Sequence, residues 1–365
     1  MSVKILTVVG ARPQFIKAAM FSHAINESSV IDQVLVHTGQ HFDYGMSQVF
    51  FEELSIPVPD VNLGISGGTH AEMTGKMMIA LEHTMNEENP DCVLVFGDTN
   101  STLAAALSAA KLCIPVVHAE AGFRTHFLTN PEEVNRVCTD HISSLLFAPI
   151  PCALKELKRE GLEDKSVFTG DLMYDAYREY SVIARKKKIE LVDLNGTRVK
   201  LPKQYSYLTC HRQENTSREI LNEVLRAVEE LEMPVVYPIH PRVSSFITDL
   251  QNIYSFKNTI FIQPVGYLES LLLLDGAEFV ITDSGGLQRE AFFAQKKCVT
   301  LLPFPSADET LIGNRNSLVS PVLSQSILDA LMIPQEIDPA YQPFGDGHAA
   351  EKMVQEIQNF FGGKQ

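Results

Sequence analysis

Short apolar runs alternate with longer segments of helical periodicity along the chain, and this alternation predicts the elements. The expected strands are 5–9, 33–37, 92–97, 115–118, 145–148, 205–210, 235–239, 259–262, 278–282 and 297–302. The helices expected in the first half are 46–54, 70–85, 101–111 and 132–143. Alternating strands and helices predict parallel sheets with crossover helices, and the pattern occurs twice. The predicted fold class is α/β, with two doubly wound Rossmann-like domains and a cleft between them.

The same pattern predicts where the domains meet. A stretch over 177–203 reads as irregular, and we place the boundary slightly before it, near Asp171. We therefore expect an N-terminal domain over 1–171 and a C-terminal domain over 172–348. In the tail, 349–365, Met353 and Ile357 lie on one face of a helix. This helix is expected to pack back on the N-terminal domain.

Composition narrows the class of protein. Of the 365 residues, 45% are hydrophobic and 21% are charged, which is typical of a globular protein. The net charge of −15 argues against a nucleic-acid partner, because such binding needs a basic face. The apolar runs are too short to cross a membrane, and the N-terminus lacks a signal-peptide pattern. Six scattered cysteines are expected to be buried free thiols, which favours a cytoplasmic location.

The turn Ser284-Gly285-Gly286 carries the clearest chemical signal. It follows an apolar strand and opens a helix-like segment. Glycines let the backbone approach a ligand closely, and a helix N-terminus presents N–H groups to an anion. The turn therefore predicts a diphosphate site, and Glu290 lies farther along the helix, where it suits ribose hydroxyls. The alternative is a turn that is merely tight.

Ligands of open parallel sheets lie beyond the carboxyl ends of the strands, so polar residues there are the candidates. Arg12 and Lys17 follow the first strand and suit a phosphate group, the alternative being surface cations with buried stems. His37, His41 and Asp43 follow the second strand and suggest a metal at first sight. Their spacing fits no zinc pattern, so we interpret this segment as a polar loop and predict no metal site.

Acidic residues follow the third and fourth strands. Either Asp98 or Asn100 is expected to cap the next helix, which leaves room for a functional Asp98. Glu120 lies at the end of the fourth strand, where burial without a partner would be costly. Glu132 and Glu133 begin a later helix, and the alternative for them is a favourable charge in its first turn.

The second half offers histidines at the same kind of position. His211 follows a strand and is the obvious candidate for a general acid or base, because its ordinary pKa lies nearest neutrality. His240 follows the next strand. One half thus supplies carboxylates and cations, and the other supplies a histidine and an anion-binding turn. A cleft between two domains is the usual place for such a polar ligand site.

The motifs occur in a fixed order over about Lys4 to Val319. The strings are Val9-Gly10-Ala11-Arg12-Pro13-Gln14-Phe15-Ile16-Lys17, Val36-His37-Thr38-Gly39-Gln40-His41, Gly97-Asp98-Thr99-Asn100-Ser101-Thr102, Glu120-Ala121-Gly122, Pro131-Glu132-Glu133-Val134-Asn135-Arg136, His211-Arg212-Gln213-Glu214-Asn215 and Asp283-Ser284-Gly285-Gly286. Together they closely resemble the non-hydrolysing, bacterial type of the UDP-N-acetylglucosamine 2-epimerase family. One string alone is weak evidence, whereas the ordered set is strong.

The resemblance implies a fold like that of two-domain glycosyltransferase-B enzymes and a role for each motif. It implies that the backbone of Ser284, Gly285 and Gly286 holds the UDP diphosphate and that Glu290 holds the ribose. It implies that Arg12 and Lys17 lie near the phosphates or the sugar, and that Arg136 and His240 line the cleft. The acid–base and sugar-site positions implied by the resemblance are Asp98, Glu120, Glu132 and His211.

The resemblance also implies the reaction. It is reversible inversion at C2 of UDP-N-acetylglucosamine to UDP-N-acetylmannosamine, through elimination of UDP to a 2-acetamidoglucal and re-addition. The product is expected to serve bacterial surface polysaccharide. Nothing in the sequence requires a metal or a nicotinamide, so we predict no cofactor. The expected partner is the UDP-sugar substrate, and a homodimer is expected.

Two positions depart from the family pattern. Ala307 stands where an arginine or tryptophan is common, and Ser270 stands where some members place an aromatic residue beside uracil. Members that act on UDP-2,3-diacetamido-2,3-dideoxy-glucuronate share most of the same motifs, so another UDP-sugar remains an alternative substrate. Two further functions stay open: a glycosyltransferase, which would also need an acceptor site, and a non-catalytic UDP-sugar sensor.

Overall fold

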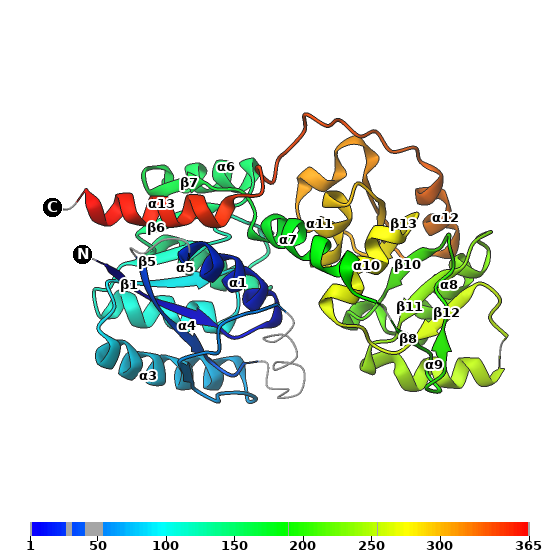
Figure 1. Cartoon of the computed structure of the whole chain (residues 1–365), viewed down its shortest axis with the longest axis horizontal. Coiled ribbons are helices and arrows are strands. Elements are labelled where there is room, and N and C mark those ends of the chain that lie inside the picture. The colour runs from blue at the N-terminus through cyan, green and yellow to red at the C-terminus, as the bar shows by residue number, and fades with distance from the viewer. Residues whose placement is uncertain (1, 27–30, 41–53, 189, 254, 364–365) are drawn as a thin grey trace. The chain divides into compact units, whose positions relative to one another are not determined.

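The computed structural model describes residues 2–26, 31–40, 54–188, 190–253 and 255–363. The chain forms two compact units (Figure 1). The first unit comprises Met1–Ala176 and Gln342–Gln365, and the second comprises Tyr177–Tyr341. Each unit contains a parallel sheet flanked by helices.

The sheet of the first unit has seven strands in the order β3-β2-β1-β4-β5-β6-β7. The strands are β1 (Val3–Val9), β2 (Ile31–His37), β3 (Val61–Asn62), β4 (Cys92–Phe96), β5 (Val116–Ala119), β6 (Leu145–Ala148) and β7 (Ser166–Phe168). The helices are α1 (Arg12–Asn26), α3 (His70–Glu88), α4 (Asn100–Lys111), α5 (Pro131–Ile142) and α6 (Pro151–Arg159), with a 3₁₀ turn at Glu163–Lys165. All neighbouring strands run parallel.

The sheet of the second unit has six parallel strands in the order β12-β11-β10-β13-β14-β15. They are β10 (Ser206–Thr209), β11 (Val235–Pro238), β12 (Thr259–Ile262), β13 (Phe279–Thr282), β14 (Lys297–Thr300) and β15 (Asn316–Leu318). The helices are α8 (Arg218–Glu229), α9 (Pro241–Ile253), α10 (Tyr267–Gly276), α11 (Gly285–Phe293) and α12 (Ser324–Met332). Two 3₁₀ segments (Gln213–Asn215 and Asp308–Asn314) and the hairpin of β8 (Leu191–Val192) and β9 (Arg198–Val199) complete the unit.

The central strands are apolar because helices cover both faces of a parallel sheet. Every residue of β4, Cys-Val-Leu-Val-Phe, is buried, as expected of such a strand. In the first unit Leu6, Val8 and Val95 pack with Met77 and Leu81 of α3. A separate cluster fills the second unit and joins Leu208 and Ile281 to residues of α8 and α9. Each unit therefore has its own hydrophobic core.

Both sheets have the same topology. Numbered from its own first strand, each sheet follows the order 3-2-1-4-5-6, which is the Rossmann order, with one further strand in the first unit. The direction of winding reverses between β1 and β4 in one unit and between β10 and β13 in the other. Ligands of this fold bind at that reversal, beyond the carboxyl ends of the strands. The predicted class, α/β with two Rossmann-like sheets, is confirmed.

The stretch over 177–203, which we predict to be irregular, is helical in its first part. Helix α7 spans Leu172–Lys186. Tyr177, Tyr180 and Ala184 are buried and lie one helical turn apart or nearly so. This apolar stripe is a helix signal that the following basic run obscures. His41 and Asp43 lie outside the described residues. The helix predicted over 46–54 also lies outside them, except for its last residue.

The C-terminal helix belongs to the first unit. Helix α13 (Ala349–Gly362) packs on α1, and its buried face includes Met353 and Ile357. Asp175 of α7 accepts a hydrogen bond from the backbone N–H of Ala350, at 2.8 Å. Figure 1 shows this helix in red alongside the first unit.

The described residues bear on two further sequence expectations. No helix among them is long and apolar enough to cross a membrane. All six cysteines are free, but Cys113 and Cys138 are exposed. The expectation that the thiols are buried is therefore wrong for these two.

Candidate active site

One cavity in the first unit collects the acidic residues that follow the strands. It has a volume of about 250 Å³ and lies beyond the carboxyl ends of β1, β4 and β5. Asp98, Glu120 and Glu132 all line it, as does Lys17. The other lining residues are Ala11, Pro13, Gln14, Gln40, His70, Phe96, Gly97, Thr99, Asn100, Pro131 and Asn135. We call this the carboxylate cavity.

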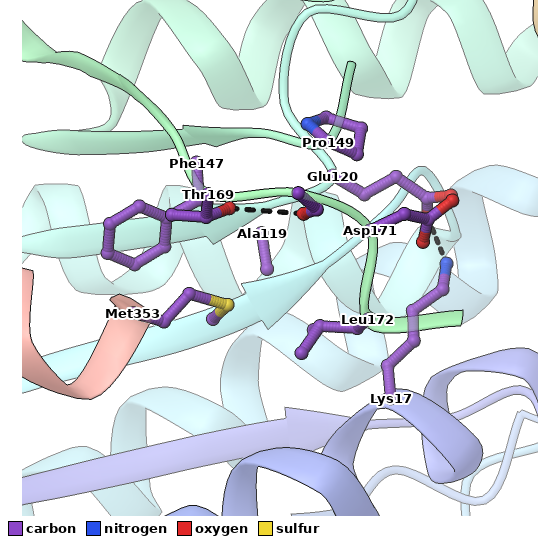
Figure 2. A pocket seen from close by; sticks show the side chains of 10 residues that line it. Lys17, Ala119, Glu120, Phe147, Pro149, Thr169, Asp171, Leu172 and Met353 are labelled. Atoms are coloured by element: carbon purple, nitrogen blue, oxygen red, sulfur yellow. Dashed lines mark hydrogen bonds and ion pairs between the residues drawn. The ribbon is translucent and has the colours of Figure 1, made fainter. Parts of the chain in front are cut away.

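Lys17 and Glu120 form an ion pair at the edge of the carboxylate cavity. Lys17 lies on α1 and is buried, and Glu120 directly follows β5 with a φ of 68°. A positive φ is uncommon outside glycine and frequent at functional sites. Figure 2 shows the Lys17 side chain directed toward Glu120, with Asp171 close by and Met353 on the far side of a smaller pocket. The cation is therefore engaged with a carboxylate of the chain.

Asp98 pairs with Arg136 of α5. Arg136 also lies 3.0 Å from a carboxylate oxygen of Glu133 and 3.8 Å from one of Glu132. Burial lowers the pKa of Arg136, but the neighbouring charge of Asp98 and the bond to Glu133 outweigh it and raise the pKa. The guanidinium thus remains charged and fixes the Asp98 carboxylate.

The two glutamates at the start of α5 differ in their surroundings. The Glu133 side chain is buried and accepts hydrogen bonds from the backbone N–H groups of Thr125 and His126. Burial raises the pKa of Glu133, but these bonds and Arg136 lower it below its usual value. The Glu132 side chain is 61% exposed and lines the carboxylate cavity. Glu133 therefore anchors a loop, whereas Glu132 is accessible to a ligand.

Helix α4 is capped by neither of the residues we predict. Its N-cap is Thr99, whose hydroxyl accepts a hydrogen bond from the backbone N–H of Thr102. Asp98 instead pairs with Arg136, and Asn100 is the first residue of the helix. The capping explanation for Asp98 is therefore wrong, and its carboxylate faces the cavity.

Gln14 is not among the predicted site residues, yet it closes the turn after β1. Its side-chain oxygen accepts hydrogen bonds from the backbone N–H groups of Gly10 and Ala11, at 2.8 and 2.9 Å. Its amide donates to the Phe96 carbonyl at 2.7 Å and to the Thr102 hydroxyl at 2.9 Å. The β1 and β4 turns are thus joined by one buried side chain.

His211 and His240 lie together in the second unit. Their rings stack with centroids 5.4 Å apart. His211 Nδ1 lies 3.2 Å from Asp283 Oδ1, and Asp283 is fully buried. Asp283 Oδ2 accepts hydrogen bonds from the backbone N–H groups of His211 and Arg212, both at 2.8 Å. Asp283 therefore orients His211. We did not predict this role, although Asp283 directly follows β13.

The Ser284-Gly285-Gly286 turn opens helix α11 as predicted. Ser284 is the N-cap, and its hydroxyl accepts a hydrogen bond from the Leu287 N–H at 3.4 Å. A Cβ added to Gly285 or Gly286 would meet no atom closer than 3.7 Å. The first N–H groups of a helix have no partner within it. The turn thus presents backbone donors at a partly exposed helix N-terminus, and Glu290 is buried farther along the same helix.

The predicted site residues gather in two places. Asp98, Glu120, Glu132, Lys17 and Arg136 come together around the carboxylate cavity. In the second unit, His211 and His240 are adjacent to each other, and Ser284 follows Asp283. Arg12 is the first residue of α1, but its side chain is not among those described. Within the described residues, no group of three or more His, Cys, Asp or Glu side chains is arranged to hold a metal ion.

Comparison with known proteins decides the family. A sequence model of the UDP-N-acetylglucosamine 2-epimerase family matches residues 23–358. The chain belongs to this family. UDP-N-acetylglucosamine 2-epimerase of Methanocaldococcus jannaschii is 38% identical, over 96% of this chain and 98% of its own. The UDP-2,3-diacetamido-2,3-dideoxy-D-glucuronate 2-epimerase of Pseudomonas aeruginosa is 41% identical, over 97% of this chain and 99% of its own.

A solved structure agrees with this 2-epimerase assignment. The crystal structure of the M. jannaschii UDP-GlcNAc 2-epimerase in complex with UDP-GlcNAc and UDP matches with a TM-score of 0.85 and 37% identity. The match covers 98% of this chain and 100% of that one. The family and the two-sheet fold that the sequence predicts are therefore confirmed, and the chain is an enzyme of the 2-epimerase family.

Proposed function

We propose that this enzyme interconverts UDP-N-acetylglucosamine and UDP-N-acetylmannosamine by inversion at C2. The observation that carries the proposal is the carboxylate cavity, where Asp98, Glu120 and Glu132 line one space beside Lys17. Inversion at C2 needs a base on one face of the sugar and an acid on the other. A cavity with several carboxylates supplies both.

The proposed chemistry is elimination followed by addition. A base removes the proton from C2 while the anomeric C–O bond breaks. The electron pair of that C–O bond leaves with UDP. The product of this step is a 2-acetamidoglucal. UDP then adds back to C1, and an acid delivers a proton to the opposite face of C2. No oxidant, reductant or hydride carrier enters this balance.

The ion pairs in the first unit support a division of labour. Lys17 stabilises Glu120 as a carboxylate, which is the form that accepts a proton. Arg136 forms an ion pair with Asp98. Glu132 is the most exposed of the three carboxylates and makes the longest of these contacts, 3.8 Å to Arg136. Neighbouring carboxylates titrate as a coupled set, so we assign the acid–base work to the group rather than to one member.

The second unit supplies groups suited to the UDP leaving group. We propose that the N–H groups of Gly285 and Gly286, at the N-terminus of α11, stabilise the developing negative charge of the diphosphate. His211, oriented by Asp283, and its neighbour His240 are the proposed titratable groups there. Arg12 for the phosphates and Glu290 for the ribose complete the proposed contacts.

A second substrate is favoured by one specific relative. The P. aeruginosa protein is named for UDP-2,3-diacetamido-2,3-dideoxy-D-glucuronate. The same elimination and addition apply to that sugar, because its C2 also carries an acetamido group. We further propose a homodimer that acts in the cytoplasm and feeds surface-polysaccharide synthesis.

The deciding experiment follows C2 by NMR in deuterated water, with each UDP-sugar supplied separately. Deuterium at C2 and appearance of UDP-N-acetylmannosamine would support the first substrate. Exchange only with the diacetamido-glucuronate would support the second. Free N-acetylmannosamine and UDP would indicate a hydrolysing enzyme. Exchange with neither sugar would overturn the proposal and favour a glycosyltransferase or a UDP-sugar sensor.

A further inference from the structure

A buried histidine outside the predicted site joins the turns that carry Asp98 and Glu120. His118 lies in β5 and is fully buried. Its Nδ1 lies 2.6 Å from Asp140 Oδ1 of α5, and its Nε2 lies 2.7 Å from the carbonyl oxygen of Gly97. The ring therefore bridges the end of β4 and α5.

Both neighbours of the ring are acceptors. A backbone carbonyl only accepts hydrogen bonds, so Nε2 donates to Gly97. Asp140 also receives the Gly122 N–H at 3.1 Å and pairs with Arg124 at 2.7 Å. Burial raises the pKa of Asp140, but His118 and Arg124 outweigh it and lower the pKa. Asp140 is thus a carboxylate that accepts a hydrogen bond from His118 Nδ1.

The groups that this pair holds are next to the acid–base residues. Gly97 directly precedes Asp98, and Gly122 follows Glu120 by two positions. Gly97, Glu120 and Gly122 all have a positive φ, of 61°, 68° and 88°. A Cβ on Gly97 would lie 3.0 Å from Glu120 Oε2, so the two turns approach closely. Glycine adopts such a backbone readily, but at Glu120 it persists only where surrounding contacts over-determine it.

We propose that His118 and Asp140 are positioning residues that set the places of Asp98 and Glu120 for proton transfer at C2. Neither side chain lines the carboxylate cavity. Their effect passes through the Gly97 carbonyl on one side and the Gly122 N–H on the other. This role rests on the proposed epimerisation, because it is defined by the proton transfer that Asp98 and Glu120 carry out.

Two substitutions test separately the two hydrogen bonds that the His118 ring makes. In His118→Gln the side-chain amide reaches the position of Nε2 and keeps the bond to Gly97, and in His118→Asn it reaches the position of Nδ1 and keeps the bond to Asp140. Because Gly97 adjoins Asp98, we expect His118→Asn to lower kcat about 100-fold and His118→Gln only about 10-fold, as for ångström-scale misplacement. KM and the Kd for UDP should stay within about threefold of the wild type.

The matched control is His141→Asn on the same helix as Asp140. The His141 side chain is 47% exposed and contacts Glu160, so this variant should keep the wild-type kcat. Wild-type kcat in both His118 variants would overturn the proposal. So would a parallel loss of kcat, UDP affinity and unfolding midpoint in both, because that pattern marks a purely structural role.

A second measurement does not depend on activity. In ¹⁵N-histidine-labelled wild-type enzyme, one ring should show slow exchange of N–H protons held by buried acceptors, and this signal should vanish in His118→Gln. Absence of any slowly exchanging ring proton in the wild type would overturn the positioning role. If the wild type shows this signature but exchanges neither UDP-sugar at C2, the proposed function fails while the bridging geometry stands. The two failures are thus distinguishable.

Discussion

Two turns beside the winding reversals, one after the first strand of its sheet and the other after the fourth, are finished differently. In the first unit, the Gly10 and Ala11 N–H groups after β1 are taken by the Gln14 side chain. In the second unit, the turn after β13 is capped by Ser284, and a Cβ on Gly285 or Gly286 would meet no atom closer than 3.7 Å. A side chain takes the backbone donors of the first turn, whereas the second turn is the one that we propose for the diphosphate.

The contrast shows how one fold provides two kinds of chemistry. Where the backbone donors are already satisfied, side chains at the ends of β4 and β5 face the carboxylate cavity. Where the donors remain at a helix N-terminus, the backbone itself suits an anion. In the proposed function, the first unit provides the charges that move a proton, and the second provides the fixed dipoles that hold the diphosphate.

The largest expected effect separates these two roles. Asp98→Asn and Glu120→Gln should each lower kcat by about 10²–10⁴-fold, because each removes a proton-transfer group. The Kd for UDP, measured by calorimetry, should change little, since Asp98 and Glu120 are not among the proposed diphosphate contacts. Glu87→Gln on the exposed face of α3 is the control. Loss of UDP binding in the carboxylate variants would contradict the division between units.

The next effect tests whether Gln14 truly closes its turn. Gln14→Leu leaves the Gly10 and Ala11 N–H groups and the Phe96 carbonyl without this partner. The Phe96 carbonyl keeps its bond from the Thr102 hydroxyl. Each of the two unsatisfied N–H groups costs about 1–3 kcal/mol, so the free energy of unfolding should fall by roughly 2–6 kcal/mol. Urea unfolding measures this, with Gln355→Leu on the exposed face of α13 as control. Unchanged stability would show that Gln14 does not close the turn.

A third prediction concerns a buried carboxylate in the first unit that is not paired like Asp98. Burial raises the pKa of Asp175 to about 6, against lowering by hydrogen bonds from Ala350 and Ala349. The folded state therefore holds a proton that the unfolded state has released. Protonated Asp175 therefore contributes to the free energy of unfolding. This contribution is fully present below about pH 4 and is lost as the pH rises through about 6.

Asp175→Asn removes the titratable carboxyl group and, with it, the loss of stability as the pH rises. Relative to the wild type, the variant should gain on the order of 1–3 kcal/mol between about pH 4 and pH 7. Urea unfolding at several pH values gives the difference curve, and Asp249→Asn on the exposed face of α9 should give a flat one. A variant that loses stability with rising pH would contradict the assignment.

The smallest effect concerns the open turn. Ser284→Ala removes the N-cap of α11 and should cost about 1 kcal/mol of stability. It should also weaken UDP binding by roughly 5-fold, since the turn is less well fixed. Ser217→Ala removes the equivalent cap of α8, where the hydroxyl accepts the Ile220 N–H, and should lower stability alone. Equal effects of both variants on UDP binding would contradict the proposal that the Ser284 turn binds UDP.

The sequence predicts the parts of the site that depend on topology. Alternating strands and helices place Asp98 and Glu120 at one edge of a sheet, because the carboxyl ends of parallel strands share that edge. The Ser284 turn is predicted for the same reason, since its two glycines mark where a strand passes into a helix. Both predictions need only local pattern and the known geometry of parallel sheets.

The sequence does not predict contacts between side chains that are distant along the chain. His118 ends a predicted strand, and only the fold reveals Asp140 beside it, 22 residues later. Likewise, Thr99 rather than Asp98 caps α4, because Arg136 is available to pair with Asp98. The three-residue strands β7 and β15 are too short to show a period. These features depend on which partners the fold brings near.

The first unit is assembled from two separated parts of the chain, since α13 packs on α1 and Asp171 N–H donates to the Phe344 carbonyl. A ribosome makes the segment from Gln342 onward only after the whole second unit has been synthesised. The first unit, which contains the carboxylate cavity, therefore lacks α13 on α1 while the second unit is synthesised. The second unit can fold during this time. The order of completion is the reverse of the order of synthesis.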